Sequence, residues 1–409
     1  MNPVPNPATA PRPSPAVRGA LYYTFYWGVV GVYYPFLGVY LTDLGLSGTQ
    51  IGVLYALLPL MALLAAPFVS LLADRRGWRV RLLRGALFAL APVALALALP
   101  RAFWGILPLL GLLALLRAVA EPLADSLAVR MAARYRLRYG TLRLWGSLSF
   151  AATALVFGGL WERVGFGLMF PATGLLFLLV AFSAAGLEEG RTEAGTSRRP
   201  FQEVSRDRGL VVLFVASLLI GASLGVFNTF SGVYLGALGA GELLVGALFA
   251  LSALAELPTM HLADRMGTRP TRAGLVPVLG ERPGPAALLL SYGLLTLAYL
   301  GFSLTAVPAL LLLFGALKGL GFGLFFVGTV RLVDARTPLE WSTTFQSLIM
   351  GAAAFGLGQL VASPLGGLLY DLVSPGSVFL ACALLSLAAS LTLLAAWGAF
   401  TPVLQPEGP

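Results

Sequence analysis

Long apolar runs recur along the whole chain, and each has the length of a membrane-spanning helix. Crossing the hydrocarbon core of a bilayer takes roughly 20 apolar residues per helix. Twelve continuous runs of this kind can be marked, without the alternation of apolar and polar residues that a porin strand shows. They cover residues 19–41, 51–72, 82–99, 102–125, 141–160, 165–187, 210–235, 243–262, 286–305, 307–330, 344–369 and 377–400. The pattern predicts an all-α membrane protein with twelve transmembrane helices.

The composition agrees with this pattern. Of the 409 residues, 58% are hydrophobic and only 11% are charged, whereas about a quarter of the residues in a soluble domain are charged. The single cysteine, Cys382, and the single histidine, His261, are too few for the ligand sets of common metal sites. We therefore expect neither a metal nor a cofactor.

The excess of positive charge lies in alternate loops. The side of the membrane that carries the N-terminus collects 22 of the 27 basic residues, whereas only Arg101 and Arg163 fall in loops on the opposite side. Loops rich in arginine stay in the cytoplasm. We expect a multi-pass protein of the cytoplasmic membrane with both termini in the cytoplasm. The net charge of +9 then records orientation in the bilayer, and no nucleic-acid partner is expected.

The chain contains an internal repeat. Residues 31–57 match residues 225–251 at a constant offset of 194, with 13 identities in 27 positions. The repeat predicts two pseudo-symmetric six-helix bundles in the same orientation. We expect a disordered cytoplasmic tail at 1–17, a first bundle at 18–187, a linker at 188–209, a second bundle at 210–402 and a short tail at 403–409.

A second repeat lies in two loops of the charged side. Ala73-Asp74-Arg75-x-Gly77-x-Arg79 recurs as Ala263-Asp264-Arg265-x-Gly267-x-Arg269. Charges at helix ends can bridge to neighbouring helices and favour one conformational state over another. We expect these loops to act as gates and not as binding sites. The gating residues are Asp74, Arg75, Arg79, Asp264, Arg265 and Arg269.

With these two halves and the repeated Asp-Arg-x-Gly-x-Arg loop, the sequence resembles the major facilitator superfamily over its transmembrane length. The segment Tyr139-Gly140-Thr141-Leu142-Arg143-Leu144-Trp145-Gly146-Ser147 is similar to the branch that contains lactose permease and the phenylpropionate and nucleoside proton symporters. This resemblance implies a solute site between the two halves, alternating access and proton coupling.

Few charged residues fall inside the predicted helices. A charge near the bilayer centre costs at least about 2.5 to 3.5 kcal/mol, so each is a candidate functional residue. They are Arg117, Glu121, Asp125, Arg143, Glu256 and Lys318. Arg117, Glu121 and Asp125 are spaced by four residues, which places them on one stripe of a helix.

The resemblance assigns roles to several of these residues. Lactose permease holds its sugar with a carboxylate and an arginine spaced as Asp125 and Arg143 are here, so these two are the predicted substrate pair. Phe150 stands where that protein has a sugar-stacking tryptophan, so a galactoside is not the expected solute.

Glu256 is the expected partner of Lys318, the only lysine in the chain, and we predict that this pair couples protons to transport. Glu121 and Arg117 are further coupling candidates. A static structural role is the alternative for each pair.

Polar residues without charge complete the candidate site. Tyr26 and Tyr33 share one face of the first helix and offer hydroxyl groups to a solute. Tyr22 lies near the end of that helix and is expected to anchor it at the membrane interface. Asn228 and Gln346 are weaker candidates, because buried amides often bond only a neighbouring helix.

The function predicted from these features is secondary transport of a small polar or organic-acid solute, such as a sugar, a nucleoside or an aromatic acid, by proton symport. Efflux of a drug or metabolite by proton antiport is the alternative, and a non-transporting membrane sensor is a more remote one. An enzyme is not expected, because the sequence has neither a Gly-x-Ser-x-Gly elbow nor a catalytic His/Cys cluster. We expect the chain to work as a monomer with solute, protons and lipid as its partners.

Overall fold

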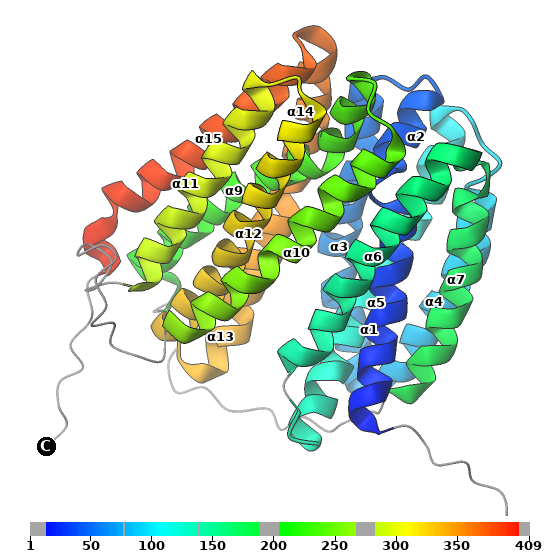
Figure 1. The fold of residues 1–409 in the computed structure, drawn as a ribbon. Coiled ribbons are helices and arrows are strands. Elements are labelled where there is room, and N and C mark those ends of the chain that lie inside the picture. Colours follow the sequence, from blue (N-terminus) through cyan, green and yellow to red (C-terminus); the bar gives the residue numbers. More distant parts are fainter. Residues whose placement is uncertain (1–13, 77, 138, 188–203, 267–282, 401–409) are drawn as a thin grey trace, which may run out of the picture.

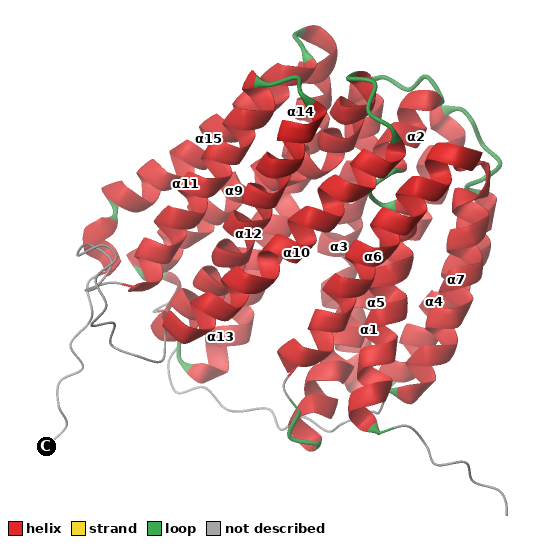
Figure 2. Cartoon of the chain, in the orientation of Figure 1, coloured by secondary structure: helices red, strands yellow, loops and turns green. Residues whose placement is uncertain are grey.

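The computed structural model describes residues 14–76, 78–137, 139–187, 204–266 and 283–400, and these residues are almost entirely helical (Figure 2). Most of both predicted tails and of the predicted linker lies outside the described residues. The division of the chain at 188–209 therefore stays a prediction.

Within these described ranges, twelve spans form two bundles of six, as the apolar runs predict. The first bundle contains α1 (Pro15–Tyr33) with α2 (Leu37–Asp43), α3 (Gly48–Arg76), α4 (Arg79–Ala96), α5 (Phe103–Arg134), α6 (Tyr139–Val164) and α7 (Met169–Ser183). The second contains α9 (Arg208–Ala237), α10 (Glu242–Met266), α11 (Pro283–Leu304), α12 (Pro308–Arg336), α13 (Leu339–Gln346) with α14 (Gln359–Leu372), and α15 (Pro375–Ala395). Helices are required because lipid offers no hydrogen-bond partner to the backbone.

Ten spans within the described residues are long and apolar enough by themselves to cross a membrane. The two others have identifiable reasons for lower hydropathy. The α4 helix begins with three arginines in its first two turns, and α1 carries four tyrosines and is separated from α2 by a break at Pro35. Proline causes such breaks because it removes a backbone donor and crowds the preceding turn.

Local signals mark where several helices begin or bend. Side chains of Ser14 and Asp207 cap α1 and α9 by accepting hydrogen bonds from the backbone N–H groups of Val17 and Leu210. These caps satisfy donors that have no partner inside the helix. The eleventh span is composite, because a π-helical segment, Ser347–Gly358, joins α13 to α14. Such segments locally change the direction and register of a helix.

The two bundles meet at one end and diverge toward the other (Figure 1). We call the face where α1 begins and α15 ends the terminal face, and the opposite face, where α3 and α10 begin, the closed end. At the closed end α3 packs on α14 and α6 packs on α10, so each contact joins the two bundles.

The sequence repeat reappears as a reciprocal contact between the bundles. Gly38 faces the carbonyl oxygen of Thr229 and the side chain of Val233. Gly232, its equivalent in the repeat, faces the carbonyl oxygen of Pro35 and lies against the side chain of Val245. Gly38 therefore contacts α9, which carries Gly232, and Gly232 contacts the turn before α2, which carries Gly38. Such a reciprocal contact is expected beside a pseudo-twofold axis. A side chain at either glycine would hold the two backbones apart.

Arg336 fastens the terminal face of the second bundle. From the end of α12 its guanidinium donates to both carboxylate oxygens of Asp207 at 3.0 Å and to the backbone carbonyl of Ala399, and it lies over the ring of Phe400 at 4.9 Å. The arginine side chain is only 12% exposed. One side chain thus connects the start of α9 with the segment that follows α15.

Replacing Arg336 by alanine is expected to lower the free energy of unfolding by roughly 2 kcal/mol, because a shielded carboxylate and a carbonyl lose their charged donor. Thermal unfolding in detergent measures this loss. Arg206→Ala, at an exposed arginine of the same face, is the control and should stay within about 0.5 kcal/mol of the parent. Equal stability of the two variants would show that the Arg336 contacts do not hold this face together.

Candidate functional site

Three tyrosines of α1 and three charged residues of α5 form a ladder of hydrogen bonds in the first bundle. The hydroxyl of Tyr23 donates to Asp125 at 2.6 Å, and that of Tyr26 donates to Glu121 at 2.6 Å. One turn before Glu121 on α5, Arg117 donates to the hydroxyl oxygen of Tyr33 at 2.8 Å. The rungs follow one another because the two helices run in opposite directions, so that Tyr23 meets the later carboxylate and Tyr33 the earlier arginine.

Arg117 also forms an ion pair with Glu121 within α5. Its Nε donates to Oε1 of Glu121 at 3.1 Å, and a second guanidinium nitrogen contacts the same oxygen. The arginine side chain is 11% exposed, and the carboxylate side chain is 38% exposed. The spacing of four residues, seen in the sequence, produces this pair. The charges of Arg117 and Glu121 thereby neutralise each other without a bound solute.

Arg143 of α6 lies close to side chains of both bundles. Its guanidinium lies 3.8 Å from Oδ2 of Asp125, 6.0 Å from the ring centre of Trp27 and 5.7 Å from the ring centre of Phe326. Phe326 belongs to α12 of the second bundle, so Arg143 marks the seam between the halves. The side chains of Arg143 and Asp125 are 36% and 45% exposed. The predicted substrate pair is thus brought together at the seam, partly open to solvent.

Lys318 lies on α12 of the second bundle, among ring faces and one hydroxyl group. Its ammonium group donates to the hydroxyl of Ser252 at 3.4 Å and lies 5.6 and 5.2 Å from the ring centres of Phe227 and Phe322. Ring faces attract a cation that has lost its water. The lysine is 7% exposed.

The predicted direct pair between Glu256 and Lys318 is not formed in this conformation. Within the described residues, Glu256 has no basic group within the 4.0 Å of an ion pair. The charges of Lys318 and Arg143 nevertheless lie close enough to act on it. The ammonium group of Lys318 contacts rings and a hydroxyl where the sequence predicted the carboxylate of Glu256. Glu256 is therefore half-buried and has no fixed counter-ion among the described residues.

The other predicted binding residues lie at three different places. Phe150 packs at the contact of α6 with α10, beside a small cluster of alanines. Asn228 is half-buried on α9. Gln346 donates to Asp334 at 2.7 Å and to Ser342 at 3.2 Å, so its amide serves a network at the α12–α13 connection.

The prediction that Tyr22 anchors the first helix at the membrane interface is wrong. The Tyr22 side chain is 1% exposed and its ring stacks on that of Tyr26 at 5.9 Å, so it packs inside the bundle beside the ladder tyrosines and does not anchor the helix at the membrane interface. The physical reason is that α7 and α6 pack against α1 and cover it.

Most of the predicted gating residues lie outside the part of the chain whose side chains are described. This applies to Asp74, Arg75, Asp264, Arg265 and Arg269. Arg79, at the start of α4, is buried to 8% exposure. The gating role of these loops stays a prediction.

Several residues of the site escaped the sequence interpretation. They are Tyr23, Trp27, Ser252, Phe227, Phe322 and Phe326. Tyr23 and Trp27 could have been found, because they lie within one turn of Tyr26 on the same helix. Phe227 could also have been noticed, because it aligns with Tyr33 at the repeat offset of 194, whereas nothing in the sequence distinguishes Phe322 and Phe326 from the many other aromatic residues of the chain.

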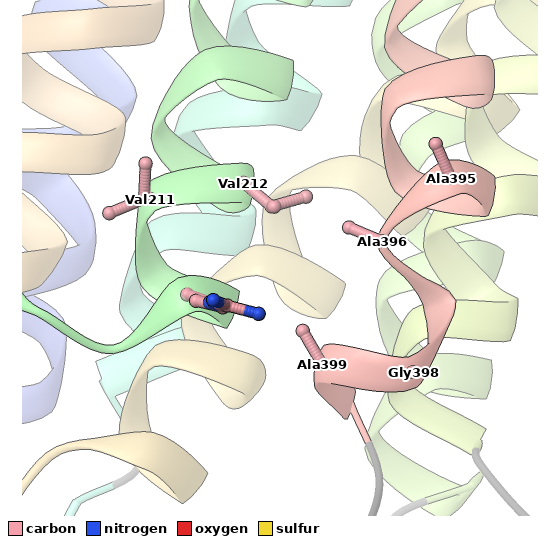
Figure 3. Close-up of a pocket in the computed structure, with 7 residues that line it drawn as sticks. Val211, Val212, Ala395, Ala396, Gly398 and Ala399 are labelled. Atoms are coloured by element: carbon pink, nitrogen blue, oxygen red, sulfur yellow. The ribbon is translucent and has the colours of Figure 1, made fainter.

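A hollow of about 580 Å³ lies elsewhere, between the start of α9 and the end of α15 (Figure 3). Arg208 is the charged residue among the apolar side chains and glycine that line it. None of the ladder residues, Arg143, Glu256 or Lys318 contributes to it, so it is not part of the candidate site. Within the described residues, no three His, Cys, Asp or Glu side chains gather as a metal ion would require.

The geometry suits reversible binding of a polar solute. Arg143, with Asp125 beside it, lies between ring faces of the two bundles, and the bundles converge at the closed end (Figure 1). A two-bundle helical protein with polar groups sheltered at its seam is a membrane carrier by class.

Comparison with solved structures identifies the same architecture. The chain superposes on the nucleoside transporter NupG with a TM-score of 0.76, covering 94% of this chain and 99% of that one at 14% identity. It superposes on a bacterial homologue of the human lysosomal transporter Spinster, in an inward-facing and unoccupied conformation, with a TM-score of 0.64 at 14% identity, covering 95% of each chain. At these identities the similarity shows the fold alone.

The sequence itself shows the family. Residues 17–381 match the MFS_1 like family, and the chain belongs to it. It is also 28% identical over 351 residues to the maltose permease of Geobacillus stearothermophilus, a match that covers 85% of this chain and 86% of the relative. The protein is therefore a transporter of the major facilitator type that moves a small-molecule solute through a membrane.

A double-mutant cycle tests whether Arg117 and Glu121 act as one unit. Glu121→Ala is expected to cost roughly 2 to 3 kcal/mol of stability, because it strips a shielded guanidinium of its carboxylate. Adding Arg117→Leu should recover part of this loss, with a coupling energy of at least about 1 kcal/mol. Thermal unfolding of the parent, both single variants and the double variant measures it. Additive losses would show that the pair is not energetically coupled.

Proposed function

We propose that the chain is a proton-coupled secondary transporter that carries a small hydroxyl-bearing solute of the sugar or nucleoside class by alternating access. The observation that carries this proposal is the position of Asp125 and Arg143 at the seam, with ring faces of both bundles beside the arginine.

Asp125 is suited to accept hydrogen bonds from a solute. One of its oxygens accepts a hydrogen bond from the Tyr23 hydroxyl at 2.6 Å, and the other lies 3.8 Å from Arg143. A carboxylate has about four lone-pair sites. A solute hydroxyl placed between Asp125 and Arg143 would accept from the arginine and donate to the carboxylate.

The rings beside Arg143 favour a solute that also has a flat or apolar face. Trp27 belongs to the first bundle and Phe326 to the second. A solute held there would touch both bundles, so its affinity would depend on how the bundles are placed relative to each other. This dependence is what allows a solute to shift a conformational equilibrium. The names of the maltose permease and the nucleoside transporter support solutes that combine hydroxyl groups with rings.

Glu256 is the proposed proton carrier. A carboxylate with a permanent counter-ion stays ionised, whereas a half-buried one without such a partner can gain and lose a proton as its surroundings change. The charges of Arg143 and Lys318 both reach Glu256. When a solute engages Arg143, the field at Glu256 changes, which would couple solute binding to protonation.

The conformation fits an inward-facing state in this proposal. The arginine-rich terminal face, toward which the bundles diverge, would be the cytoplasmic one, and the closed end would face the exterior. The ends of α3 and α10, which carry Asp74 and Asp264, lie toward the terminal face and would approach each other when the carrier closes there.

Glu256→Gln is expected to lower proton-driven accumulation by at least about tenfold while counterflow exchange of solute continues, because the amide cannot carry a proton but keeps the shape of the site. Uptake into proteoliposomes with and without an imposed pH gradient measures both activities. Asp43→Asn, at an exposed carboxylate of the closed end, is the control. Full accumulation by Glu256→Gln would remove this residue from the coupling mechanism.

The solute class is tested with purified protein in liposomes that contain a pH indicator. Nucleosides, maltose and an aromatic acid are added in turn, and the proposal expects proton entry with a nucleoside or a sugar. Proton movement in the opposite direction would indicate antiport. A response to the aromatic acid alone would contradict the proposed solute class.

A further inference from the structure

Two carboxylates clasp the closed end, one at each contact between the bundles. The first is Asp371 in the last turn of α14. It accepts hydrogen bonds from the backbone N–H of Gly48 at 2.7 Å, the backbone N–H of Thr49 at 2.8 Å and the hydroxyl of Thr49 at 2.7 Å. Gly48 and Thr49 are the first residues of α3, in the other bundle.

The second carboxylate belongs to Glu162 in the last turn of α6. It accepts a hydrogen bond from the backbone N–H of Leu243 at 2.9 Å, in the first turn of α10. Thr49 and Leu243 occupy equivalent positions of the sequence repeat, at the offset of 194. Asp371 and Glu162 therefore perform the same task on opposite sides of the pseudo-twofold axis.

Small residues bring the helices close enough for these bonds. A Cβ atom at Gly52 would overlap the carbonyl of Ser363, and one at Gly246, its equivalent in the repeat, would overlap the carbonyl of Ala154. On α14 the contact runs through Ser363, Gly367 and Asp371. On α6 it runs through Ala154, Gly158 and Glu162, with the same spacing of four residues.

We propose that Asp371 and Glu162 form a paired latch that holds the closed end shut. The first N–H groups of a helix have no partner within the helix and carry partial positive charge. A carboxylate from the other bundle satisfies them only while the bundles touch. Opening this end returns the carboxylates and the N–H groups to water and removes the charge-assisted bonds.

The two latches are unequal. Asp371 accepts three hydrogen bonds across the bundles, and Glu162 accepts one, among the described residues. The α3–α14 side is therefore the stronger, and the α6–α10 side should separate first. The latch lies at the face opposite the ends of α3 and α10 that carry Asp74 and Asp264, so it is a separate control of the cycle. It rests on the proposed rocking of the two bundles.

The opening of the closed end can be followed through the reactivity of a buried thiol. Ser363 is 2% exposed at the contact with α3, and Cys382 is the only native cysteine. In a Cys382→Ser background, Ser363→Cys should react with a membrane-impermeant maleimide, added on the closed-end side of proteoliposomes, only when this end opens. The labelling rate then reports the opening equilibrium.

Asp371→Asn should speed labelling roughly tenfold, because an amide nitrogen replaces one of the oxygens that face the donors. Glu162→Gln and Thr49→Val should each speed it roughly threefold, since each loses part of one latch. Asp43→Asn is the matched control for loss of a carboxylate at the same end and should leave the rate unchanged. The proposal is wrong if Asp371→Asn labels at the rate of Asp43→Asn.

Two further measurements separate the latch from other effects. In protein that keeps Ser363, labelling of native Cys382, which is fully buried, reports unfolding and should not accelerate in any latch variant. Acceleration there would assign the effect to instability and overturn the latch. Gly52→Leu should wedge the closed end open. If this wedge leaves Ser363→Cys unreactive, the end does not open at all, and the proposed alternating access fails together with the latch.

Discussion

The constraint on which this structure depends is that a charge inside an apolar bundle must find a partner within the protein, because lipid provides none. The first bundle meets it with a ladder in which α1 supplies hydroxyl groups and α5 supplies charges. The second bundle meets it differently, with ring faces and a serine around Lys318. The charged groups of Asp125, Arg143 and Glu256 are only partly shielded from solvent by such contacts.

Symmetry explains how the seam can be sealed at one end and remain polar in the middle. The closed end consists of equivalent glycines, carbonyls and carboxylates from the two repeats, so each bundle offers the other the same surface. Toward the terminal face the repeats differ. Phe227, beside Lys318, stands at the repeat position that Tyr33 has in the first bundle, so a ring without a hydroxyl replaces one rung of the ladder. In the proposed mechanism, the geometry that the repeats share would serve movement, and the residues in which they differ would serve solute and proton chemistry.

Much of the fold could be predicted from the sequence, because hydropathy sets the number of spans and the repeat sets their grouping. The Arg117–Glu121 pair follows from helical spacing, and Asp125 beside Arg143 follows from the family resemblance. The surroundings of Lys318 could not be predicted, since they depend on which of many phenylalanines point inward. The closed-end carboxylates were also missed, although Gly158 and Glu162 share their spacing with Gly367 and Asp371. Their role depends on contacts with residues that are distant in the sequence. Glu162 and Leu243 are 81 positions apart, and Asp371 and Gly48 are 323 positions apart.

In the proposed alternating access, water reaches the polar residues at the seam from one face at a time. In a Cys382→Ser background, Phe326→Cys places a thiol beside Arg143, where the two bundles face each other. The most direct measurement is labelling of this thiol by an impermeant maleimide added to one side of the membrane or the other. We expect labelling from the terminal face in the resting protein and protection when a transported solute is added. Equal labelling from both faces, or none from either, would contradict it.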